Sequence, residues 1–265
     1  MTTEPRDTPR GVLIVTGTGT GVGKTVVTAA IAALATARGD RVAVVKPAQT
    51  GVDPNAPDKS DTPDADTVRR LAGVADTREL ARFPDPLSPE AAARVSGLPP
   101  LDMRAAADYI AGLAENRDLV LVEGAGGLLV RYDPAGTTIA DLAATLDAPV
   151  VVVAAAGLGT LNHTALTCEA LAARKIIRRG VVIGSWPNHP GLAEHTNLGD
   201  LEAVTGEPLA GLLPEGAGQL GRTAFIAAAR GGLAARLGGT WSHLHPPSPL
   251  APRPPSPAPT AARDS

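Results

Sequence analysis

The chain has 265 residues, of which 44% are hydrophobic and 19% are charged, a composition typical of one sizeable globular α/β domain. A net charge of −3 without a concentrated basic stripe argues against nucleic acid as a partner, and an aromatic content of 2% leaves few platforms for stacked bases. Because the sequence shows no bilayer-length apolar run, no signal-peptide core and only one cysteine, Cys168, we expect a cytoplasmic protein without membrane contact.

The first predicted elements carry the clearest chemical signal. Residues 12–15 are a β-branched apolar run that predicts a buried strand, and a glycine-rich turn then leads through Lys24 and Thr25 into a predicted helix over residues 26–34. Such a turn cradles polyphosphate on backbone N–H groups, while the lysine reaches the outer phosphates and the hydroxyl ligates Mg²⁺. Gly17 comes one residue earlier than in the usual motif, so we expect a longer loop. The alternative is a glycine-rich turn without a ligand.

A second buried strand is predicted over residues 41–46, and it ends at Lys46 and Pro47. Ligands of open parallel sheets collect at the carboxyl ends of strands, so we expect Lys46 beside the phosphate loop; a solvated strand-end lysine is the alternative. A loop rich in Pro and Asp then precedes a predicted helix over residues 64–72. Its Asp64 and Asp66 are equally well explained as charges that stabilise the helix N-terminus.

A further buried strand, residues 118–123, ends in a carboxylate, Glu123, followed by small residues at 124–127. Phosphoryl-transfer sites commonly take a second Mg²⁺ contact from a carboxylate at such a strand end. The small residues keep the backbone close to a bound ligand. The alternative is an acidic residue that ends the strand by chance.

The rest of the chain continues the alternation of helix and strand. We predict helices over residues 101–116 and 138–146 and strands over residues 148–154, 180–187 and 208–215, which indicates a parallel sheet covered by helices on both faces. Residues 157–163 begin a predicted helix that runs towards Arg174, and the unpaired N–H groups at the start of this helix suit a carboxylate. His163 in this segment is either a general base or a structural histidine. We expect a flexible segment over residues 1–10, one domain over 11–240 and a disordered Pro/Ala-rich tail over 245–265.

Four motifs, taken in order, resemble the dethiobiotin synthetases of biotin biosynthesis: residues 17–25, Lys46-Pro47, residues 123–127 and residues 159–163. The resemblance covers residues 12–215. It implies a P-loop ligase that joins CO₂ to 7,8-diaminononanoate and closes a cyclic urea at the expense of ATP, through a carbamate and a carbamic-phosphoric anhydride. It also implies Mg²⁺ and a homodimer with the active site at the subunit interface.

The resemblance also implies roles for individual residues. Lys46 would stabilise the carbamate and its phosphorylation, and Lys24 would bridge it to the γ-phosphate. Thr25, Asp66 and Glu123 would hold Mg²⁺, so the motif favours Asp66 over Asp64. The implied nucleotide contacts are Gly21, Val22, Gly23, Lys24, Thr25, Val26, Asp66, Glu123, Gly124, Ala125, Gly126, Gly184, Ser185, Pro214 and Glu215. The implied substrate contacts are Thr20 and Thr50, with Gly159, Thr160, Leu161 and Asn162 of the partner subunit meeting the substrate carboxylate.

The sequence departs from the family pattern at two places. Gly21 stands where many members carry a glutamate in the phosphate loop. Gly184 and Ser185 stand where many carry Asn-Asp, a pair that recognises the adenine edge. We therefore expect weaker discrimination between bases, with backbone groups and contacts near Pro214 and Glu215 holding the base.

Two other functions compete with the synthetase. A partitioning-type ATPase that binds protein partners would carry a second lysine early in the phosphate loop, where residues 17–21 contain none. An amidating synthetase of the cobyrinic acid type would need a glutamine-hydrolysing domain, for which the chain has no spare length, and Cys168 lies in a predicted helix instead of a nucleophile turn.

Overall fold

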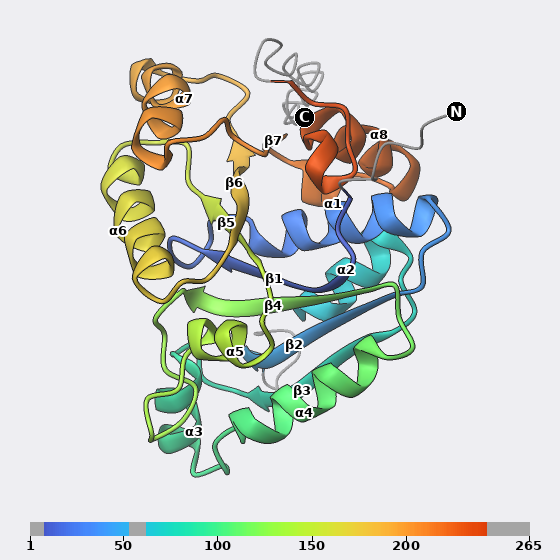
Figure 1. Ribbon diagram of the computed structural model, residues 1–265, viewed down its shortest axis with the longest axis vertical. Coiled ribbons are helices and arrows are strands. Elements are labelled where there is room, and N and C mark those ends of the chain that lie inside the picture. The colour runs from blue at the N-terminus through green and yellow to red at the C-terminus, as the bar shows by residue number, and fades with distance from the viewer. Residues whose placement is uncertain (1–7, 53–61, 243–265) are drawn as a thin grey trace, which may run out of the picture.

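The computed structural model of this chain describes residues 8–52 and 62–242 (Figure 1). The expected tail over residues 245–265 and the first seven residues of the expected N-terminal segment lie outside the described residues. Among those that are described, no helix combines the length and the apolar character needed to cross a membrane.

A sheet of seven parallel strands forms the centre of the molecule, in the order β3-β2-β4-β1-β5-β6-β7. Its innermost strand, β1, pairs with β4 on one side and with β5 on the other, so that Ile14 lies opposite both Val122 and Val150. The strands are β1 (Gly11–Gly17), β2 (Val42–Thr50), β3 (Thr77–Phe83), β4 (Leu119–Gly127), β5 (Val150–Ala154), β6 (Arg178–Trp186) and β7 (Gly211–Pro214). The prediction of a parallel α/β sheet is confirmed.

Helices cover both faces of this sheet (Figure 1). They are α1 (Lys24–Ala37), α2 (Asp64–Ala72), α3 (Pro89–Ser96), α4 (Met103–Ala114), α5 (Ile139–Thr145), α6 (Thr160–Ala173), α7 (Leu192–Thr205) and α8 (Arg222–Gly232). Successive strand residues enter different cores: Leu13 and Val15 pack with α1, α2 and α8, whereas Ile14 packs with the helices of the other face. Both cores are mostly aliphatic, and burying one Val, Leu or Ile side chain stabilises the fold by about 1.5–3 kcal/mol.

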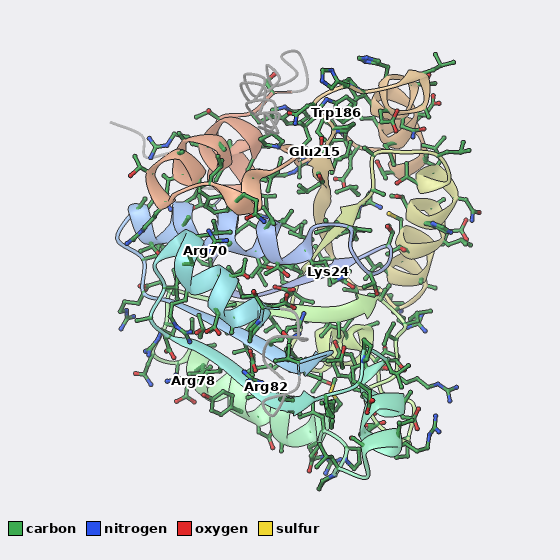
Figure 2. The ribbon with its side chains drawn as sticks, turned by 180° about the vertical axis from the view of Figure 1, so that it is seen from behind. Lys24, Arg70, Arg78, Arg82, Trp186 and Glu215 are labelled. Atoms are coloured by element: carbon green, nitrogen blue, oxygen red, sulfur yellow. The ribbon has the colours of Figure 1, made fainter. Side chains whose placement is uncertain are left out.

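The edge strand β3 is an element that the sequence analysis did not predict. Its Arg78 and Arg82 are exposed and lie along the outer edge of the sheet (Figure 2). An edge strand faces water on one side, and charged side chains there discourage pairing with another chain. The same charges conceal the apolar pattern by which buried strands are recognised, since Thr77 and Phe83 at its two ends are its buried residues.

The strand order also decides which residues meet. Strand β4 lies between β1 and β2, and all three run in the same direction. The phosphate loop after β1 therefore lies beside Lys46 of β2 and Glu123 of β4, on the side of the sheet where ligands of open parallel sheets bind. The strands predicted to end at Lys46 and Glu123 continue to Thr50 and Gly127, and the pairing of β2 with β4 stops just before these two residues, at Val45 and Val122.

Candidate active site

The glycine-rich loop connects β1 directly to α1. Gly23 precedes the first helical residue with a φ of 95°, a conformation that favours glycine, and it offers no capping side chain, so the helix N-terminus is open to an anion. Lys24 is buried, and its Nζ donates to the Gly19 carbonyl over 2.7 Å. Burial, and then the nearby Lys46 ammonium, lower the pKa of Lys24 to about 8.

Lys46 of β2 is held by three acceptors. Its Nζ lies 2.5 Å from Asp64 Oδ2, 2.9 Å from Glu123 Oε1 and 3.2 Å from the Gly124 carbonyl oxygen. Burial alone would lower the pKa of Lys46, but the carboxylates of Glu123 and Asp64 raise it above its ordinary value. The ammonium group therefore stays charged inside the protein.

The two carboxylates also converge on the hydroxyl of Thr25. Thr25 Oγ1 lies 2.9 Å from Asp64 Oδ1 and 2.8 Å from Glu123 Oε1. Burial raises the pKa of Glu123, whereas for Asp64 the effect of burial is outweighed by Lys46, which lowers its pKa. The side chains of Thr25, Asp64 and Glu123 offer oxygen atoms as metal ligands, and Mg²⁺ prefers oxygen ligands. Mg²⁺ sites typically combine one or two carboxylates with substrate phosphates. Within the described residues, no group of three or more His, Cys, Asp or Glu side chains could hold a metal by itself.

The choice of Asp66 over Asp64 is corrected by the structure. Asp66 is exposed and ion-paired with Arg69, and it lines a separate hollow between α2 and β3. Two residues along a helix are rotated by about 200°, so Asp64 and Asp66 cannot both face the phosphate loop. Gln49 fixes which one does, because its Oε1 accepts the Asp64 backbone N–H over 3.0 Å. Sequence reasoning missed Gln49, although it lies only three residues beyond Lys46 on the same strand.

One cavity of about 730 Å³ joins these groups. Its walls include most of the predicted loop and strand-end residues: Thr20, Gly21, Gly23, Lys24, Thr25, Val26, Lys46, Thr50, Glu123, Ala125 and Gly126. The remaining lining residues include Ala48, Gln49, Gly51, Thr62, Asp64 and residues 86–89. Val22 instead packs beside the core under α1, and Gly124 contributes its carbonyl to Lys46. Figure 2 shows Lys24 near the middle of the molecule, above the sheet.

The residues implied to hold the base lie elsewhere along the sheet edge. The backbone N–H of Glu215 donates to the Trp186 carbonyl over 2.7 Å, so the ends of β6 and β7 lie together (Figure 2). Gly184 packs against the phosphate loop: a Cβ there would lie 2.0 Å from the Val22 carbonyl oxygen. This backbone therefore has no room for a base-recognising side chain at 184, while Ser185 is exposed.

The predicted anion site at the start of α6 does not share the cavity. Gly159, with a φ of 88°, precedes the helix without a capping side chain, and Asn162 and His163 are exposed. Thr160 is buried and donates from its hydroxyl to the Ala155 carbonyl over 2.7 Å. Among the described residues that line the cavity of this chain, none comes from α6.

A parallel sheet with a glycine-rich loop before α1, and two lysines and two carboxylates at its ligand-binding edge, defines a P-loop nucleotide-binding protein. A family model described as an AAA domain matches residues 11–219. The cell division ATPase MinD of Pyrococcus furiosus has the same fold, with a TM-score of 0.51 at 19% identity, covering 86% of this chain and 97% of that one. At this identity the likeness concerns the fold alone.

Curated relatives identify the particular family. The chain is 61% identical to the ATP-dependent dethiobiotin synthetase of Frankia casuarinae, over 86% of this chain and 94% of the relative. It is 59% identical to the enzyme of the same description from Streptomyces avermitilis, over 87% and 94%. The chain belongs to the dethiobiotin synthetase family, which confirms the resemblance drawn from its motifs.

Proposed function

We propose that this chain catalyses the ATP-dependent formation of dethiobiotin from 7,8-diaminononanoate and CO₂ in biotin biosynthesis. The observation that carries the proposal is the buried ammonium of Lys46, held by three acceptors in the cavity that also contains Lys24 of the phosphate loop. Two cations that share one cavity suit a reaction whose intermediates are anions.

Each chemical step makes or moves negative charge. One amine nitrogen attacks the carbon of CO₂ and loses a proton, giving a carbamate. A carbamate oxygen attacks the γ-phosphorus, and the bond to the bridging oxygen breaks as ADP leaves. The second amine then attacks the carbamoyl carbon, loses a proton and expels phosphate to close the ring. Lys46 would stabilise the carbamate, and Lys24 the phosphoryl group in transfer, without reorganising during the reaction.

Thr25, Asp64 and Glu123 would hold Mg²⁺, since their oxygens converge and Mg²⁺ accepts such donors together with phosphate oxygens. The bound ion would neutralise charge on the β- and γ-phosphates. Thr25 lies in the first turn of α1, so one of the three ion-binding oxygens lies at the same helix N-terminus as the phosphate cradle.

We further propose a homodimer in which the substrate carboxylate meets the open N-terminus of the partner's α6. Its support is that the start of α6 is an anion site outside the cavity of its own chain, and that Leu158 and Leu166 beside it are 96% and 56% exposed. Sedimentation of the purified protein tests this, since replacing Leu166 with glutamate should shift a dimer towards monomers. We also infer that the protein is cytoplasmic, because its reaction consumes ATP.

The decisive experiment mixes the purified full chain with Mg²⁺, bicarbonate, 7,8-diaminononanoate and ATP, and measures dethiobiotin and inorganic phosphate together. We expect equal amounts of both products, and no phosphate release above background without the diamine. The Lys46→Met variant should form both products about 100- to 1000-fold more slowly while binding nucleotide normally. Rapid phosphate release that is independent of the diamine, with no dethiobiotin, would refute the proposal and favour a nucleotide-driven switch.

A further inference from the structure

The peptide group that joins Gly124 to Ala125 is hydrogen-bonded at both of its ends. Its carbonyl oxygen accepts from Lys46 Nζ over 3.2 Å, and its N–H donates to the phenol oxygen of Tyr132 over 2.6 Å. A peptide group is planar, so its carbonyl and N–H turn together. The orientation of the carbonyl towards Lys46 is therefore coupled to the hydrogen bond at Tyr132.

Tyr132 is itself rigidly held. Its side chain is fully buried in the core beneath β4, and its backbone N–H donates to the Thr137 carbonyl over 2.9 Å. Burial raises the pKa of Tyr132, which keeps the phenol neutral. The phenol oxygen is thus a fixed acceptor.

The segment of β4 that Tyr132 contacts is rich in glycine. Gly124 and Gly126 flank Ala125, and Gly126 has a φ of 67°, so two of three consecutive residues have unusual backbone freedom. Lys46 uses the Gly124 carbonyl as the third acceptor of its ammonium, after Asp64 and Glu123, and an ammonium has three donors. Rotation of this peptide would leave one buried donor without its acceptor.

We propose that Tyr132 is a positioning residue for Lys46: its phenol orients the Gly124–Ala125 peptide group, whose carbonyl in turn holds the ammonium in the reaction cavity. The inference rests on the proposed function, because it assigns Tyr132 an effect on the step that Lys46 serves. Tyr132 does not line the cavity, so its influence passes through one peptide group.

Tyr132→Phe tests this inference, since it removes the phenol oxygen and keeps the ring in the core. The chain contains a matched control in Tyr109, whose hydroxyl accepts from Arg78 Nε over 3.2 Å on the surface of α4. For Tyr132→Phe we expect kcat for dethiobiotin formation to fall about five- to tenfold, as for the loss of one buried hydrogen bond. We expect the KM for ATP and the stoichiometry of nucleotide binding to stay unchanged. Hydrogen exchange at the Ala125 amide should accelerate. Tyr109→Phe should leave all of these unchanged.

A kcat for Tyr132→Phe within about twofold of the wild type would overturn the inference, because one lost hydrogen bond should cost more. So would a fall in kcat matched by an equal fall in nucleotide-binding stoichiometry, which would indicate misfolded enzyme. A parallel Lys46→Met variant separates the two proposals. Normal turnover by Lys46→Met would remove Lys46 from the proposed reaction, whereas an inactive Lys46→Met beside a normal Tyr132→Phe would overturn only the role of Tyr132.

Discussion

Lys46→Met should change the stability of the protein as well as its activity. The substitution keeps an unbranched chain of similar length but leaves Asp64 and Glu123 facing one another without the ammonium that lies 2.5 and 2.9 Å away. Removing one partner of a buried ion pair typically costs about 3–5 kcal/mol. For a domain of this size, that cost lowers the melting temperature by about 6–20 °C. Because turnover loses a preorganised cation, it should fall about 100- to 1000-fold.

Thermal unfolding with and without Mg²⁺ provides the measurement. A divalent ion can take the place of the lost ammonium between the two carboxylates, so excess Mg²⁺ without nucleotide should stabilise Lys46→Met more than the wild type. Arg82→Met is the matched control, because Arg82 is exposed on β3 and paired with Glu79, and such surface pairs contribute about 0–1 kcal/mol. If Lys46→Met had the melting temperature of the wild type, and Mg²⁺ stabilised both proteins equally, the reasoning about Lys46, Asp64 and Glu123 would be wrong.

Three further outcomes are expected. Asp64→Asn should weaken Mn²⁺ binding measured by electron paramagnetic resonance in the presence of ADP, whereas Asp66→Asn should not. Weaker Mn²⁺ binding by Asp66→Asn alone would favour Asp66 as the metal ligand. Gly184→Ala should displace the loop at Val22 and weaken ATP binding by about 1–3 kcal/mol by calorimetry, with Gly199→Ala, where a Cβ meets open space, as its control. Nucleotide affinity of the free enzyme should fall as the pH rises through about 8, where Lys24 loses its proton. Bound phosphates favour the ammonium, so binding takes up a proton above that pH, and the affinity falls by up to about tenfold per pH unit; an affinity that is flat across this range would contradict the assignment.

The motifs along the chain predicted much of this protein because their chemistry is local. A β-branched run, a glycine-rich turn and Lys24-Thr25 specify a strand, a phosphate loop and a helix within one short segment, and the structure has β1 and α1 there. The sequence predicts Lys46 and Glu123 as site residues in the same way, from polar residues that follow buried apolar runs, although β2 continues to Thr50 and β4 to Gly127. The ordered set also predicted the family, which the relatives confirm.

Other features depended on contacts between segments that are distant in sequence, and only the tertiary structure decided them. Whether Asp64 or Asp66 faces the site depends on how Gln49 of β2 holds the start of α2, a contact that helix propensity cannot supply. The edge strand β3 has no strong pattern of its own and is specified by pairing with β2. Tyr132 acquires its contact with Ala125 only when the chain beyond β4 folds back against that strand. Short segments can specify which groups the chemistry needs, but their mutual placement depends on packing that no single segment contains.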